Sequence, residues 1–219
     1  MTNVNVGSML SRKYLIWNEV LNAVTHGIGV ILSIIGLLFL IQKGLALGGT
    51  LEVASYTIYG STLILLYLSS TLYHSLTFTK ARYVMRIIDH CSIFLLIAGT
   101  YTPYTLITIG GRLGITLTVI IWSIALFGVI YKTVWFKKLQ GLSLWLYIAM
   151  GWISIFFLSY LYKGLGTQGF LWLMGGGASF TIGALFYRLK HVKFMHVVWH
   201  LFVLTGTICM FFSIYFYTL

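Results

Sequence analysis

The last long apolar run of the chain, residues 196–217, reads HVVWHLFVLTGTICMFFSIYFY. About 18 or more apolar residues suffice to cross the roughly 30 Å hydrocarbon core of a membrane as a helix, so this run predicts a transmembrane helix. It opens with His196 and His200, which lie one turn apart on one helical face because successive residues are separated by about 100°. An isolated pair of histidines with this spacing more often lies at the membrane interface without binding anything than it binds a metal ion. Ionisable groups are costly in membranes, however, so functional partners are expected elsewhere in the chain.

The composition of the whole chain indicates an integral membrane protein. Of the 219 residues, 59% are hydrophobic and 8% are charged, and the mean hydropathy is +0.96. These values exclude an ordinary soluble domain. Short connections predict an all-α fold, a single seven-transmembrane helix bundle over residues 1–219 with a short tail at 1–18. The predicted spans are 20–41, 53–76, 87–109, 113–131, 142–162, 170–187 and 196–217.

The basic residues predict the orientation of this bundle. The net charge is +11, with 14 Lys and Arg against three acids. One side carries Arg12, Lys13, Lys80, Arg82, Arg86, Lys132, Lys137, Lys138, Arg188, Lys190 and Lys193, and the other carries Lys43, Arg112 and Lys163. Because cytoplasmic connections are enriched in Lys and Arg, we predict a cytoplasmic N-terminus and an outside C-terminus. Basic residues in short connections orient helices, so a nucleic-acid partner is not expected.

Two glycine and proline features modify the predicted spans. Pro103 in the third span predicts a local distortion, because proline lacks a backbone donor and clashes with the preceding turn. The sixth span contains Gly175, Gly176 and Gly177. Close packing against a neighbouring helix is the default interpretation of such a run, and a groove for a lipid chain is the alternative.

Polar clusters in four spans fall at one depth. Within each cluster, spacings of three or four residues place most members on one helical face. Successive spans run in opposite directions, so the end of the second span and the starts of the first, third and seventh all lie near the cytoplasmic face. The clusters are Glu19, Asn22 and His26; Ser70 and His74; Arg86, Asp89 and His90; and His196 and His200.

Histidines in these clusters predict a zinc site. Three neutral imidazoles with water in the remaining position are a ligand set typical of catalytic zinc. His74, His196 and His200 are the candidate ligands. His26 and His90 remain alternatives by spacing alone.

The other polar side chains have predicted roles around the metal. Asp89 is the only carboxylate inside the third span, and a carboxylate near a metal-bound water can orient it or take its proton. The alternative for Asp89 is a structural ion pair with Arg86, one turn away. We expect His26 to form hydrogen bonds with Glu19 and Asn22 on its own helical face.

The ordered pattern resembles a known family. The motifs are Glu19-x-x-Asn22-x-x-x-His26, Ser70-x-x-x-His74 with Asp89 beyond it, and His196-x-x-x-His200. Together they resemble the progestin and adipoQ receptor family, specifically its bacterial hemolysin III branch, over nearly the whole chain. The short N-terminal tail is similar to that of the bacterial members, which implies a multi-pass protein of the bacterial cell membrane.

This resemblance implies roles for individual residues. It implies Zn²⁺ at His74, His196 and His200, Asp89 at the bound water and Ser70 beside the ligands. Alkaline ceramidases, in the wider superfamily, resemble this site in its three histidines, serine and aspartate around zinc.

Three functions follow as hypotheses. The first is a zinc-dependent hydrolase of a lipid amide or ester, with a membrane lipid as substrate and the site near the cytoplasmic leaflet. The second is a non-enzymatic, receptor-like regulator of membrane homeostasis, in which a lipid is a ligand and the zinc is structural. The third, pore-forming cytolysis, is disfavoured because seven apolar spans leave no soluble precursor state.

Overall fold

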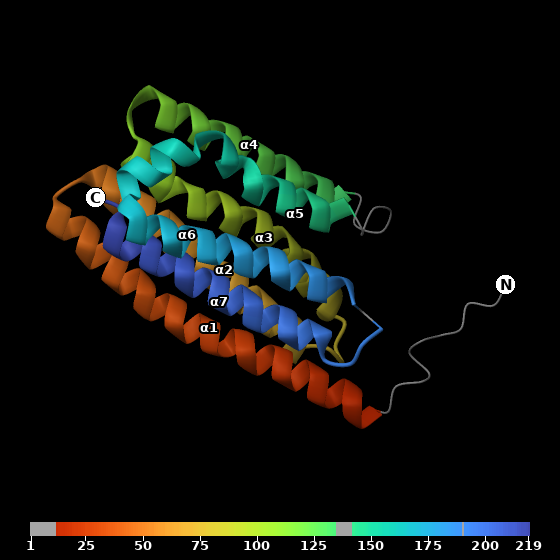
Figure 1. Cartoon of the computed structure of the whole chain (residues 1–219). Coiled ribbons are helices and arrows are strands. Elements are labelled where there is room, and N and C mark those ends of the chain that lie inside the picture. The colour runs from red at the N-terminus through yellow and green to blue at the C-terminus, as the bar shows by residue number, and fades with distance from the viewer. Residues whose placement is uncertain (1–11, 135–141, 190) are drawn as a thin grey trace.

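The computed structural model describes residues 12–134, 142–189 and 191–219, and these parts of the chain are helical throughout apart from short turns (Figure 1). Residues 12–18, predicted as tail, belong to the first helix. The helices are α1 (Arg12–Leu47), α2 (Thr50–Ser75), α3 (Arg82–Pro103), α4 (Gly111–Val134), α5 (Leu142–Trp152), α6 (Leu158–Arg188) and α7 (Met195–Tyr217), with a π-helix at Tyr104–Ile109 and a 3₁₀-helix at Ile153–Phe157.

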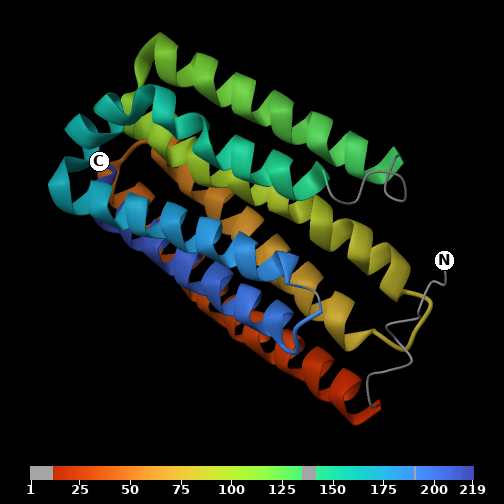
Figure 2. The same cartoon turned by 45° about the vertical axis from the view of Figure 1, so that its right-hand side comes forward.

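Six helical segments in the described parts of the chain are long and apolar enough to cross a membrane, which confirms the predicted helical membrane bundle. The predicted fifth and sixth spans fall within one segment of 47 residues, Leu142–Arg188. That segment is interrupted at Gly166, whose φ of 64° and ψ of 177° suit glycine and few other residues. Figures 1 and 2 show α5 and the later part of α6 running in opposite directions.

The first and last helices lie side by side. Helix α1 packs on α2 and α7, α7 packs on α6, and α3 separates α2 from α4. Large apolar side chains on the outer helices are exposed, for example Leu38 of α1 at 64% and Phe127 of α4 at 63%. Such surfaces suit contact with lipid tails, because the hydrocarbon core of a membrane contains no water to which the apolar side chains would be exposed.

Polar contacts join α1 to the C-terminal end of α7, at the end of the bundle opposite the polar clusters. The ammonium of Lys43 on α1 donates to the backbone carbonyls of Ile214 at 3.2 Å, of Tyr215 at 2.7 Å and of Thr218. The hydroxyls of Tyr56 and Thr218 are 2.9 Å apart. A cation at a helix C-terminus also interacts favourably with the helix dipole, so Lys43 fixes α7 to α1.

The helix containing Pro103 is distorted as predicted. Beyond Pro103 the chain continues as the π-helix Tyr104–Ile109, which ends at Gly110 with a φ of 66°. π-Helical turns are a recognised cause of helix distortion.

Several basic residues predicted in connections lie inside helices, and among them Lys132 is buried. Lys132 lies inside α4 and is buried, and its ammonium donates to the hydroxyl of Ser143 at 2.8 Å. The lysine therefore links α4 to α5. Lys137, Lys138 and Lys190 lie outside the described residues.

Candidate metal centre

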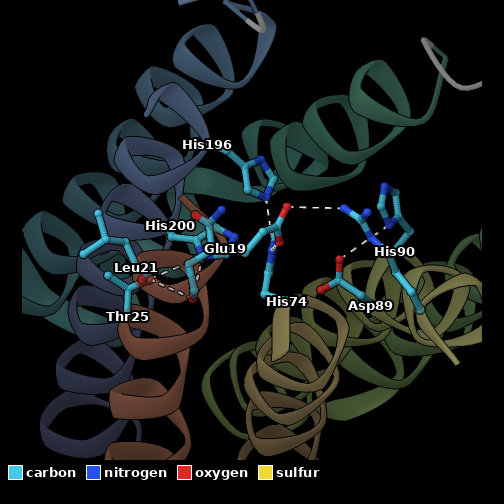
Figure 3. Close-up of polar contacts among 10 residues, drawn as sticks. Glu19, Leu21, Thr25, His74, Asp89, His90, His196 and His200 are labelled. Atoms are coloured by element: carbon cyan, nitrogen blue, oxygen red, sulfur yellow. Dashed lines mark hydrogen bonds and ion pairs between the residues drawn. The ribbon is translucent and has the colours of Figure 1, made fainter. Parts of the chain in front are cut away.

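The imidazoles of His74, His196 and His200 converge at one end of the bundle. Each can offer a ring nitrogen such that all three nitrogens lie within 4.8 Å of one another. Figure 3 shows the three rings, on α2 and α7, pointing toward one another. The helical spacing of the α7 pair and the end of α2 bring them together, as the sequence indicated.

The distance between two of these nitrogens fits a tetrahedral metal. Nε2 of His74 and Nε2 of His196 are 3.3 Å apart. Two nitrogens bound to tetrahedral zinc at about 2.0–2.1 Å would be separated by about 3.3–3.4 Å. The spacing of His74 and His196 therefore fits zinc, and a ring nitrogen of His200 lies within 4.8 Å of both as a third imidazole from the same two helices.

Helix α1 contributes partners that orient two of the three rings. Nδ1 of His74 lies 2.7 Å from Oε2 of Glu19, and Nδ1 of His200 lies 3.3 Å from the backbone carbonyl of Asn22. When Nδ1–H donates to these oxygens, Nε2 of each ring keeps the lone pair that a metal needs. Ligating histidines are commonly held in this way by a carboxylate or a carbonyl.

Two contacts at these partners had no signal in the sequence pattern. Arg82 donates from Nη2 to Oε1 of Glu19 at 3.3 Å, and its side chain is 41% exposed. The hydroxyl of Thr25 is 3.4 Å from Nδ1 of His200. In the sequence, Arg82 contributes only to the basic bias of its connection, and a threonine in an apolar helix does not by itself indicate a contact with a metal ligand.

His26 does not form its predicted hydrogen bonds. Neither ring nitrogen makes a hydrogen bond of normal geometry, although the backbone of His200 lies close to the ring. Glu19 is seven residues away, or about 10 Å along the helix axis, so its carboxylate reaches His74 of α2 instead. The His26 ring stacks on that of His200, with centroids 3.5 Å apart and planes at 9°.

The third helix supplies Asp89 and His90. Oδ2 of Asp89 is 3.5 Å from Nδ1 of His90, and that nitrogen is also 2.7 Å from the backbone carbonyl of Arg86. In the described residues His90 is not part of the three-histidine group. Asp89 and His90 lie on the α3 side of the site (Figure 3).

A cavity of about 200 Å³ connects these groups to the interior of the bundle. Its polar end is lined by His26, Ser70, Asp89, His90, His196 and His200. The rest is mainly apolar and lies among α3, α5, α6 and α7, reaching Tyr104. From Asp89 to Tyr104 the axial distance is about 22 Å at 1.5 Å per residue. The cavity is thus long, with its histidines and Asp89 at one end.

Gly176 and Gly177 of α6 have different surroundings, which correspond to the two predicted roles of close helix packing and an open groove. A Cβ on Gly176 would lie 2.8 Å from the Met210 side chain and 3.1 Å from the Gly206 carbonyl, so Gly176 allows α6 to pack on α7. A Cβ on Gly177 would meet nothing within 4 Å, and Gly177 lines the cavity. Close packing and an open groove are both present, at adjacent positions.

Comparisons with known proteins agree over most of the chain. The family model described as "Haemolysin-III related" matches residues 14–211. The chain is 46% identical to "Hemolysin-3 homolog" of Bacillus subtilis (strain 168), covering 93% of this chain and 96% of that protein. It is 45% identical to "Hemolysin-3" of Bacillus cereus, covering 92% of each. It is 26% identical to human "Monocyte to macrophage differentiation factor", over 90% of this chain and 82% of that protein.

Proposed function

This chain belongs to the haemolysin III-related family of multi-pass membrane proteins, as its motifs predicted, and from that premise we propose that it is a zinc-dependent hydrolase of lipid amides or esters. One observation carries the proposal. Three imidazoles converge, and two of them, His196 and His200, line the polar end of a long, mainly apolar cavity that Asp89 and Ser70 also line. A few polar groups at the end of an apolar pocket are typical of sites for amphipathic small molecules.

The shape of the cavity supports a lipid substrate. Its apolar length suits one hydrocarbon chain, and its polar end would hold the carbonyl group at the end of that chain. The bundle excludes bulk water, which strengthens electrostatic interactions within the site.

The chemistry follows from the groups at the polar end. Zinc held by His74, His196 and His200 would polarise a carbonyl oxygen and activate a water molecule near neutral pH. The carboxylate of Asp89 would accept the proton of the attacking water and return it to the leaving amine or alcohol. The hydroxyl of Ser70 would donate a hydrogen bond to the substrate carbonyl, and Glu19 would hold His74 in the ligating tautomer.

The test is hydrolysis by purified protein. Wild-type protein is incubated with ceramides, lysolipids and acyl amides, and released fatty acid is measured before and after zinc removal and after zinc restoration. We expect release that depends on zinc. No release from any member of the panel by zinc-loaded protein would contradict the proposal.

A regulator with structural zinc is the second candidate, and one contact favours it. Glu19 joins the candidate ligand His74 to the partly exposed Arg82, so a charge near the membrane surface is linked to the metal centre. Under this function, replacing His74, His196 or His200 with alanine would change a membrane phenotype, although the protein hydrolyses no lipid. Pore formation stays a hypothesis, and ion conductance of pure liposomes containing the protein would test it.

We also propose seven crossings, with the N-terminus in the cytoplasm. Asn22 meets His200 near the starts of α1 and α7, and Lys43 meets Thr218 near their ends, so the two helices are parallel. Parallel first and last spans require an odd number of crossings. The reversal between α5 and α6 supports counting Leu142–Arg188 as two.

A reporter fusion is expected to confirm this orientation. Alkaline phosphatase, which is active only outside the bacterial cytoplasm, should be active when fused after Leu219. As a control, fusion after Lys80, in the connection between α2 and α3, should be inactive. Inactive enzyme after Leu219 in an inserted full-length fusion would contradict the cytoplasmic N-terminus.

Filling the cavity at Gly177 is expected to reduce lipid turnover without unfolding the protein. The open space around this position admits a side chain, which then occupies volume that the lipid chain requires. Activity on a long-chain acyl substrate should fall progressively from Gly177→Ala to Gly177→Val to Gly177→Leu, with little change in melting temperature. Gly176→Leu serves as the contrast, because a clash with Met210 and Gly206 should lower the melting temperature. Unchanged turnover in Gly177→Leu would show that the chain lies elsewhere.

A further inference from the structure

The ring of His26 is a buried polar group that is not among the three candidate metal ligands. Only 4% of its surface is exposed, it lines the cavity, and neither nitrogen forms a hydrogen bond of normal geometry. Buried polar atoms without partners are uncommon and usually indicate a missing water, ion or ligand. The carboxamide of Asn22, one turn earlier and fully buried, also lacks partners for both of its polar atoms.

The position of the ring is fixed by its neighbours. One face stacks on His200 at 3.5 Å, and the ring of Tyr67 meets it edge to face with centroids 5.0 Å apart. These contacts leave the ring in a set orientation at the polar end of the cavity, beside the candidate metal ligands. A ring serving only to pack there would be better as phenylalanine, which buries no polar atom.

We propose that His26 recognises the polar group of the lipid, by a hydrogen bond between a ring nitrogen and an oxygen of the lipid next to the metal centre. A neutral imidazole offers one donor and one acceptor, so it suits a hydroxyl or an amide, which can use both. His26 is thus a specificity-determining residue that distinguishes lipids with a hydrogen-bonding group at the chain end from purely apolar chains. The inference rests on the proposed lipid occupant of the cavity and does not require hydrolysis.

The test uses a probe that cannot be hydrolysed. Radiolabelled 1-hexadecanol and 1-chlorohexadecane have equal chains, but only the alcohol forms strong hydrogen bonds. Their affinities are measured for zinc-loaded wild type, His26→Phe and His26→Gln in the same detergent, and bound zinc is measured for each. Phenylalanine keeps the stacked ring without nitrogens, and glutamine keeps a donor and an acceptor without the ring.

The expected result is a changed preference and not a general loss. Wild type and His26→Gln should prefer the alcohol, and His26→Phe should lose about tenfold of that preference while keeping its zinc and its affinity for the chloroalkane, because one hydrogen bond is removed. His26→Phe should also melt at a higher temperature without ligand, since two unpartnered nitrogens are gone.

Two results would overturn the inference. One is an unchanged preference for the alcohol in zinc-loaded His26→Phe, which would make the ring a packing group. The other is loss of zinc from both His26 variants, which would assign the ring to the metal. Because the probes have no scissile bond, either result is independent of whether the protein hydrolyses lipids.

Discussion

Replacing His196 and His200 together with alanine is expected to reduce bound zinc from about one ion per chain to background. Two of three ligands are removed from one helix, and His74 with Glu19 behind it cannot hold the metal alone. Elemental analysis of purified, dialysed protein measures the effect. Each single alanine variant should also lose most of its zinc.

A matched control is available near the same end of the bundle. His191 is exposed and is not part of the three-histidine group, so His191→Ala should keep its zinc. Stoichiometric zinc in the double variant, with the protein still folded, would place the metal elsewhere and remove the basis of the proposed function.

The second large effect is expected at Asp89, where turnover and metal retention should separate. The carboxylate lines the cavity with His196 and His200 but is not in the three-histidine group. Asp89→Asn keeps the shape of the side chain and removes its ability to accept a proton. We expect hydrolysis to fall by about 10²- to 10⁴-fold, the usual contribution of a general base, while most of the zinc remains.

Zinc content and fatty-acid release are measured on the same preparation. Glu52→Gln is the control, because it neutralises a carboxylate in the first turn of α2, at the other end of that helix from His74. Full activity in Asp89→Asn would exclude Asp89 as the base. Loss of zinc in parallel with activity would instead make Asp89 a support for the metal.

The clustering of the three histidines could be predicted from the sequence because depth and helical face follow from helix geometry. Runs of apolar residues fixed the depth of His74, His196 and His200, and the spacing of four fixed the face shared by the α7 pair. The span boundaries were less accurate: α1 starts at Arg12 and has 36 residues, and α5 and α6 form one interrupted segment. Hydropathy detects the apolar part of a helix, whereas the ends are set by connections and by local breaks such as Gly166.

The partners of individual side chains were harder to predict. Helical spacing predicts hydrogen bonds from His26 to Glu19 and Asn22. In the structure the Glu19 carboxylate contacts His74 on α2, and the backbone carbonyl of Asn22 contacts His200. Spacing within one helix shows which residues share a face but not which neighbouring helix that face meets. The cavity could not be predicted from the sequence, because it depends on how the helices pack. Only the packing shows that Gly176 contacts α7 whereas Gly177 faces open space.

The pairing of the first helix with the last has a consequence for biosynthesis. Ribosomes deliver α1 early and α7 last, yet α1 orients His200 and is tied to the end of α7 through Lys43. Contacts so distant in sequence form late, because a long loop must close first. We expect a nascent chain to remain without metal until residue 200 has entered the membrane, so that zinc loading marks the completion of assembly.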